Sequence, residues 1–99
     1  MTDFNSLAAN AKRSFAFGQL VMTTNAMRTL PPEAFGTALA RHAACDWGDV
    51  CPEDREANEV ALVHGGRLFS VYHDNQRVKF WVITEADRSA TTVLLPDDY

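Results

Sequence analysis

Hydrophobic and polar positions change their spacing along the chain, and these changes predict strands and helices. Apolar, β-branched and aromatic residues alternate or cluster at 15–22, 67–73, 78–84 and 91–95, which is typical of strands. Between the first two of these segments the spacing becomes helical, since Phe35, Leu39 and His42 recur at i, i+4 and i+7. The pattern therefore predicts the order β-α-α-α-β-β-β.

Helix boundaries are marked by capping residues and prolines. Thr23 or Thr24 caps a short helix that ends near Leu30, and a second helix runs from Pro32 or Glu33 to about Cys45. A third begins at Pro52 and ends at Gly65-Gly66. Its inward stripe is predicted to be Ala57, Val60, Ala61 and His64.

These elements predict an α+β domain with a mostly antiparallel four-stranded sheet and helices packed on one face. Residues 15–99 are predicted to form this single domain, and residues 1–14 a flexible or weakly helical N-terminal segment. Gly18 marks a bulge or a close approach of two backbones within the first strand.

The strands at 67–73 and 78–84 are apolar on both faces, because large side chains occupy odd and even positions alike. Three short helices cover one face of such a sheet. The second face, with Phe69, Val71, Trp81 and Ile83, is then covered by the N-terminal segment or by another chain. The second alternative predicts a protein-binding or homodimeric interface centred on these four residues.

A polar turn joins the last two strands and contains Glu85, Asp87, Arg88, Ser89 and Thr91. As a binding site, Arg88 would hold a phosphate or carboxylate, with hydroxyls as additional donors. As structure, Asp87 and Ser89 would bond turn amides, and Arg88 would pair with an acid such as Glu85. Both interpretations fit the residue types.

Candidate catalytic residues are His42, Tyr72 and Arg88. His42 and Asp46 are spaced i, i+4 near a helix end, a spacing that lets a carboxylate orient an imidazole, although His42 also belongs to an apolar helical face. A second set, of basic and aromatic residues, lies on or beside the first hairpin. These residue types fit binding of a nucleic-acid backbone or, alternatively, a solvated sheet edge. That set is His64, Arg67, Tyr72, His73, Arg77 and Lys79.

Charge and targeting signals narrow the function classes. The formal net charge is −4, and residues 46–63 hold six acids against one arginine, which disfavours broad nucleic-acid binding. The sequence predicts a cytoplasmic protein without a membrane span, metal or cofactor, because the corresponding motifs are lacking. In that compartment Cys45 and Cys51 are expected to remain structural thiols.

Several segments together resemble a family of uncharacterised bacterial proteins of similar length that are common on plasmids and integrated elements. They include Asp46-Trp-Gly-Asp49 and Trp81-x-Ile-Thr-Glu-Ala-Asp-Arg-Ser-x-Thr-Thr-x-Leu-Leu-Pro96. The resemblance covers most of residues 15–99 and implies a small accessory protein of a mobile element. Such products often counteract host defences, so we expect a protein partner, with inhibition of a restriction or CRISPR-type complex as one role.

The predicted topology is also similar to that of RelE-like toxins, which are metal-independent ribonucleases with helices before a three-stranded meander. This similarity implies that Arg67, Lys79 and Arg88 would stabilise phosphorane charge, while Tyr72 or His42 would move protons. The negative net charge of this chain differs from the strongly positive net charge of those toxins. A metal-independent endoribonuclease is therefore the alternative to a protein-binding module.

Overall fold

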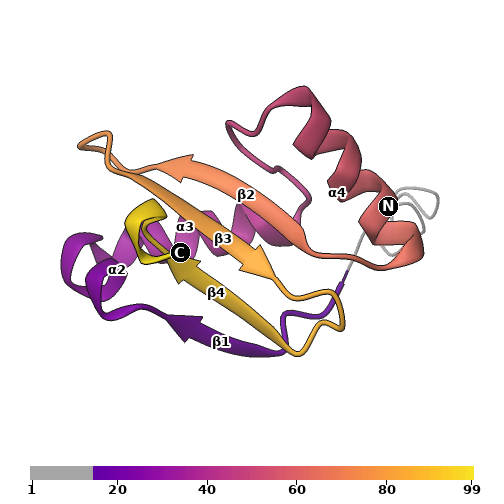
Figure 1. Ribbon diagram of the computed structural model, residues 1–99. Coiled ribbons are helices and arrows are strands. Elements are labelled where there is room, and N and C mark those ends of the chain that lie inside the picture. Colours follow the sequence, from indigo (N-terminus) through magenta and orange to yellow (C-terminus); the bar gives the residue numbers. More distant parts are fainter. Residues whose placement is uncertain (1–14) are drawn as a thin grey trace, which may run out of the picture.

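The computed structural model describes residues 15–99, and the segment expected at 1–14 lies outside this part. The α+β class and the predicted order of elements are confirmed (Figure 1). The elements are β1 (Gln19–Met22), α2 (Thr24–Thr29), α3 (Pro32–Ala43), α4 (Pro52–His64), β2 (Leu68–His73), β3 (Lys79–Thr84), β4 (Ala90–Leu94) and the 3₁₀ turn η1 (Pro96–Asp98).

The sheet is mixed rather than mostly antiparallel. Its strand order is β1-β4-β3-β2, with β1 parallel to β4 and the other two pairs antiparallel. Strands β2, β3 and β4 form an antiparallel meander. The first strand lies at the other side of β4, and β4 begins beside the start of β1, so these two strands run in the same direction.

Gly18 explains why β1 is shorter than the predicted strand at 15–22. Its φ is +65°, and a Cβ at this position would overlap the Ser89 carbonyl group. A residue without a side chain is therefore required where the backbone passes the β3–β4 turn. This is the close approach that the sequence suggested at Gly18, and it ends the extended conformation before Gln19.

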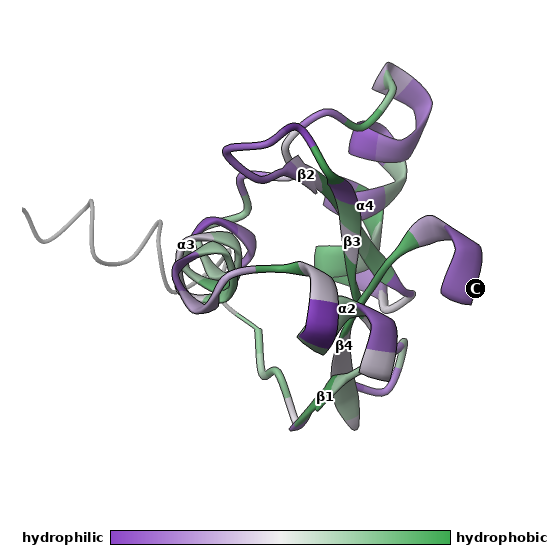
Figure 2. Ribbon diagram, turned by 90° about the vertical axis from the view of Figure 1, so that its left-hand side faces the viewer, coloured by the Kyte–Doolittle hydropathy of each residue, from purple (hydrophilic) through white to green (hydrophobic). Residues whose placement is uncertain are grey.

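Helices α2 and α3 cover one face of the sheet, as Figures 1 and 2 show from two directions. Thr23 caps α2 through its hydroxyl, and Pro32 occupies the first turn of α3, both as predicted. The buried core between the helices and this face consists of Ala26, Leu30, Ala38, Tyr72, Phe80, Val82 and Val93.

Helix α4 lies along the β2 edge and takes part in a second apolar cluster (Figure 1). The buried members of this cluster are Cys45, Trp47, Val50, Ala61, Leu68 and Val71. Phe69 and Trp81, on the other face of the sheet, pack against it. The C-terminal residue Tyr99 also lies on this second face, with its ring 5.8 Å from that of Trp81. The second face is thus partly covered by α4 and the C-terminal residues.

Candidate functional site

The four predicted interface residues lie together on the second face of the sheet. Phe69 is paired with Ile83 and Val71 with Trp81 across the β2–β3 ladder. Val71 and Ile83 are buried, whereas Phe69 and Trp81 are half-buried. The two large rings therefore form the accessible part of this surface.

A groove of about 310 Å³ runs between α4 and the sheet on this face. We call it the aromatic groove and define it by Ala57, Arg67, Phe69, Trp81, Ile83 and Tyr99. The rings of Phe69 and Trp81 are 5.1 Å apart and nearly perpendicular, at 78°. Tyr99 makes an edge-on contact with Trp81 and is 72% exposed. The groove thus presents aromatic surface on a rigid sheet.

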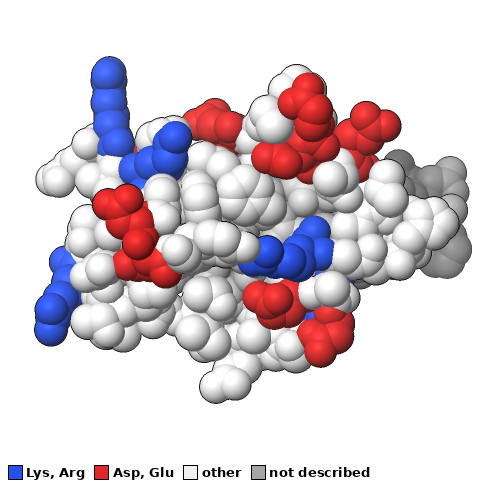
Figure 3. Space-filling view, in the orientation of Figure 1, with Lys and Arg blue, Asp and Glu red and all other residues white. Residues whose placement is uncertain are grey.

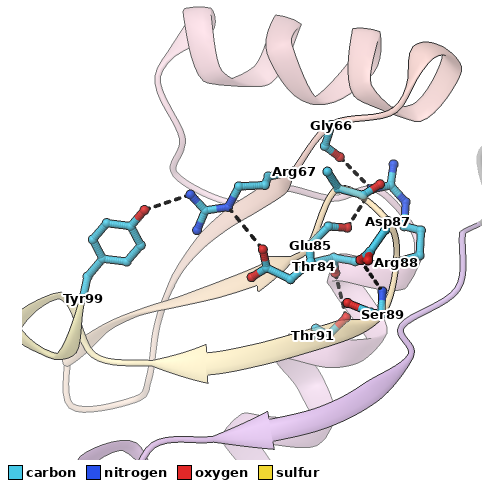
Figure 4. A network of polar contacts seen from close by, with 10 residues as sticks. Gly66, Arg67, Thr84, Glu85, Asp87, Arg88, Ser89, Thr91 and Tyr99 are labelled. Carbon is cyan, nitrogen blue, oxygen red and sulfur yellow. Dashed lines mark hydrogen bonds and ion pairs between the residues drawn. The ribbon is translucent and has the colours of Figure 1, made fainter.

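Arg67 is the cation of the aromatic groove, and its contacts hold Tyr99 in place. Its guanidinium donates a hydrogen bond of 2.8 Å to the Tyr99 hydroxyl and lies 5.5 Å from the centre of that ring. Its Nε is 3.9 Å from a carboxylate oxygen of Glu85. Figure 4 shows Arg67 between these two partners. Glu85 therefore offsets part of the charge that Arg67 brings to the groove.

The rim along α4 is acidic and carries an apolar stripe. Glu53, Asp54 and Glu56 are exposed at the beginning of the helix, and Figure 3 shows acidic side chains gathered over α4 beside a largely uncharged surface. Ala57 and Val60 are exposed too, and Val60 has 52% of its surface accessible. Acidic and apolar groups therefore lie side by side next to the aromatic groove.

The predicted inward stripe of α4 was wrong for three of its four residues. Ala57, Val60 and His64 are exposed, and only Ala61 of that set is buried. The reason is Asn58, which is 2% exposed and donates to the Phe69 carbonyl at 2.8 Å while accepting from the Phe69 amide at 3.0 Å. These two bonds rotate the Asn58 face of the helix toward β2 and leave the apolar stripe outside.

The polar turn is held by its own hydrogen bonds. Arg88 donates to the carbonyl groups of Ala61, Gly66, Glu85 and Ala86 at 2.6–3.1 Å. It pairs with no carboxylate among the described residues, in contrast to the expected ion pair with Glu85. An Asp87 oxygen accepts from the Ser89 amide at 3.0 Å (Figure 4). The contacts of Arg88 therefore tie the turn to the C-terminal end of α4.

His42 is fully buried and belongs to a chain of hydrogen bonds that crosses the core. Its Nδ1 is 2.6 Å from Ser70 Oγ, and its Nε2 is 2.9 Å from Thr84 Oγ1. Thr84 is 2.7 Å from Thr91 Oγ1, which donates to the Phe17 carbonyl at 2.8 Å. Burial lowers the pKa of His42 to about 4, so the imidazole is neutral near pH 7.

The predicted pairing of His42 with Asp46 was wrong. Asp46 accepts two bonds from the Arg41 guanidinium, at 2.8 and 3.2 Å, and these hold the pKa of Asp46 below its usual range. Helix α3 ends at Ala43, and Cys45 has a φ of 62°, so the chain turns away before Asp46. The i, i+4 relation requires a continuous helix, which this sequence does not have.

Tyr72 is also buried. It is 2% exposed, its hydroxyl donates to the Asp46 carbonyl at 2.6 Å, and Arg41 lies 4.7 Å from the centre of its ring. Burial raises the pKa of Tyr72 to about 12. Its ring belongs to the helix-covered face, whereas His73 is exposed and bonded to Asp49. The fold thus separates Tyr72 from the basic residues of the hairpin.

The three catalytic candidates do not share a site in the structure. Phe15 separates His42 from Arg88, since its ring is 5.3 Å from the His42 ring and 6.0 Å from the Arg88 guanidinium. The hydrogen bonds made by Ser70, Thr84 and Asn58 were not predicted, because they join residues that are distant in sequence. No disulfide joins Cys45 and Cys51. Within residues 15–99 no cluster of three potential metal ligands is found, and no helix is long and apolar enough to cross a membrane.

Comparisons with known proteins add no relative to these observations. No protein-family model matches the chain, and neither a curated protein nor a solved structure is detectably similar to it.

Proposed function

We propose that this protein is a protein-binding module and that the aromatic groove is its binding site. The bound segment carries a large apolar side chain that inserts between α4 and Trp81. Lysine or arginine residues flank that side chain and face the acidic rim of α4. The protein acts by occupying its partner rather than by changing it chemically.

The observation that supports this proposal best is the combination of Phe69, Trp81 and Tyr99 in one groove on a sheet face. Tryptophan, tyrosine and arginine dominate the binding energy of measured protein interfaces, and Arg67 is the fourth member here. Their edge-on contacts restrict the rings before a partner binds, which reduces the entropy lost on association.

The charges around the groove favour a basic partner. Glu53, Asp54 and Glu56 are exposed along one side, whereas Arg67 is already bonded to Tyr99 and lies near Glu85. A basic segment would therefore meet exposed carboxylates, while an acidic one would be repelled by them. Complementary charge of this kind mainly accelerates association and excludes wrong partners.

The partner is proposed to be a cytoplasmic component of a restriction or CRISPR-type complex, because the sequence resembles accessory proteins of plasmids and integrated elements. Binding at the groove would then block a surface that the defence complex needs.

Selection from a peptide display library, followed by calorimetric titration of the selected peptides into each variant, tests the proposed site. We expect selected peptides to share an aromatic or large aliphatic residue flanked by basic residues. Trp81→Ala should weaken their binding at least about tenfold, as expected for a central interface tryptophan. Asp54→Lys should weaken basic peptides and leave neutral ones little changed.

Met27→Ala provides the matched control, because Met27 is 62% exposed on α2, away from the sheet face that carries the groove. Folding of each variant is checked by circular dichroism. Peptides that bind wild type and Trp81→Ala equally well, or a selection that yields no groove-dependent peptide, would overturn the proposal.

A further inference from the structure

The two edges of the sheet differ in how their backbone groups are used. On the β2 edge, Asn58 bonds both the amide and the carbonyl of Phe69. The next outward residue, Val71, donates to the Trp47 carbonyl at 3.0 Å and accepts from the Asp49 amide at 2.8 Å. This edge is therefore closed by the chain itself.

Gly48 shows how closely the β2 edge is covered. The segment around it forms a parallel bridge with Val71, and a Cβ on Gly48 would overlap the Val71 carbonyl oxygen. Its φ of +73° also favours glycine. Residues far apart in sequence thus satisfy the β2 edge and leave no room for an added strand.

Within residues 15–99, the β1 edge carries no comparable cover. In Figure 1, β1 is the outermost strand, and no described helix or strand lies beyond it. The amides of Gln19 and Thr23 donate inward, to Ser89 at 2.9 Å and Val93 at 3.1 Å. Backbone groups alternate in direction along a paired strand, so the amides and carbonyls of Leu20 and Met22 face away from β4.

The side chains of β1 do not protect this edge. Gln19–Met22 contains neither a charged residue nor a proline, the two commonest protections of an exposed edge. Leu20 is 56% exposed and Val21 is 40% exposed, and they point to opposite faces of the sheet. The short length of the strand, four residues, restricts any pairing to a few hydrogen bonds.

We propose that two copies of this protein pair through β1, antiparallel and about a twofold axis at Val21. Leu20 then faces the partner's Met22, and each of these two symmetric pairs exchanges both backbone bonds. All outward amides and carbonyls of Leu20 and Met22 are satisfied, and the two sheets become one of eight strands.

A second copy fits this edge because the pattern is self-complementary. Leu20 and Met22, whose amides and carbonyls point outward, stand on either side of Val21. A twofold axis at Val21 therefore brings the amides of one copy opposite the carbonyls of the other without any shift in register. The two Val21 side chains meet as a non-hydrogen-bonded pair, in which side chains are closest. The absence of charge on β1 means that no electrostatic feature selects a foreign strand instead.

Pairing in this way has a consequence for the aromatic groove. The twofold axis of an antiparallel pair is perpendicular to the sheet, so both grooves face the same side of the dimer. If the proposed function holds, the dimer is bivalent, and linked sites on one target would bind more tightly than one groove alone. Dimerisation itself does not depend on that function.

Sedimentation equilibrium over a wide range of protein concentration tests the pairing. The small interface should give a dissociation constant on the order of 100 μM. Val21→Lys places two like charges on the axis and should leave only monomer. The matched control is Val63→Lys, because Val63 is 77% exposed on α4 and its replacement should leave dimerisation unchanged.

Hydrogen exchange at low and high protein concentration provides a second measurement on the unmodified chain, independent of whether Val21→Lys folds. Protection of the Leu20 and Met22 amides should rise with concentration, while that of Gln19 should change little. A chain that stays monomeric at millimolar concentration overturns the pairing, as does a dimer lost with Trp81→Ala but kept with Val21→Lys. A confirmed dimer without groove ligands would contradict the proposed function alone.

Discussion

His42 on α3 and Thr84 on β3 lie 2.9 Å apart, from imidazole Nε2 to hydroxyl oxygen, and this contact fixes the proton positions of a buried chain. The Thr91 hydroxyl donates its only proton to the Phe17 carbonyl. In the bond between the two threonines Thr91 can therefore only accept, so Thr84 must be the donor. Thr84 can then only accept from His42 Nε2, and Nδ1 accepts from Ser70. The neutral imidazole therefore carries its proton on Nε2.

Nitrogen-15 NMR of the imidazole tests this tautomer directly, and Thr84→Val tests its energetic value. We expect a protonated Nε2 and an unprotonated Nδ1 at pH 7. Thr84→Val keeps the shape but leaves the Nε2 proton without an acceptor, which should cost about 2 kcal/mol in urea unfolding. Thr92→Val, on the half-buried opposite face of β4, serves as the control. A protonated Nδ1 would contradict the assigned direction of the chain.

The buried imidazole also makes stability depend on pH. The pKa of His42 is about 4 in the folded chain and 6.5 in the unfolded one, so between these values the unfolded state binds more protons. Stability is therefore complete above pH 6.5 and falls as the pH drops toward 4, by about 3 kcal/mol in total.

Urea unfolding at a series of pH values measures that loss, and His42→Gln is the comparison. The variant should be less stable at pH 7. Its free energy of unfolding should also depend less steeply on pH, because the contribution of this imidazole is missing. Carboxylates such as Asp98 and Asp87, whose pKa values are lowered mainly by hydrogen bonds from Thr23 and Ser89, contribute at lower pH. Equal slopes for the two proteins between pH 6.5 and 4.5 would show that His42 is not the group responsible.

Local patterns predicted the elements of this fold, because alternation, caps and prolines act within a few residues. The order of helices and strands and the ends of α3 and α4 near Pro32, Pro52 and Gly65 follow from such signals. The parallel pairing of β1 with β4 does not, since it depends on where β4 enters the sheet. A pattern in one strand contains no information about the direction of a neighbour 71 residues away.

The candidate site was predictable only in its apolar part. The two-faced strands placed Phe69 and Trp81 on an accessible surface, because alternation fixes which side chains share a face. The same reasoning failed for α4, where hydrophobicity favoured Val60 over Asn58 as the inward residue. The free energy gained by satisfying two backbone groups of Phe69 outweighs the burial of one valine.

Replacing Asn58 should therefore open the β2 edge. Asn58→Leu has similar volume but leaves the amide and carbonyl of Phe69 without partners, and we expect a loss of about 3 kcal/mol for the two groups. Hydrogen exchange at the Phe69 amide should accelerate well beyond the change seen at Ser70, which bonds into the sheet. Glu56→Ala, at an exposed position of the same helix, is the control and should shift stability by less than about 0.5 kcal/mol. An unchanged Phe69 amide would mean that the Asn58 contact does not close the edge.

Arg88 offers a test that separates side-chain bonding from backbone strain. It has a φ of 62°, a conformation that is unfavourable for residues other than glycine, and its guanidinium binds four backbone carbonyls. Arg88→Ala loses these bonds and keeps the strained backbone, whereas Arg88→Gly loses the bonds and relieves the strain. We expect Arg88→Ala to be less stable than Arg88→Gly by about 1 kcal/mol in urea unfolding, with both below wild type by more than about 1 kcal/mol.

Ser89→Ala is the matched control for Arg88, because Ser89 is exposed in the same turn and its amide, which bonds Asp87, is kept in the variant. It should remain within about 0.5 kcal/mol of wild type. The Arg88 variants should also loosen the C-terminal end of α4, where Ala61 and Gly66 accept from the guanidinium, so exchange of the nearby amides should accelerate. Wild-type stability in both Arg88 variants would show that the guanidinium is not needed for the turn, and Arg88 would then be available for a ligand.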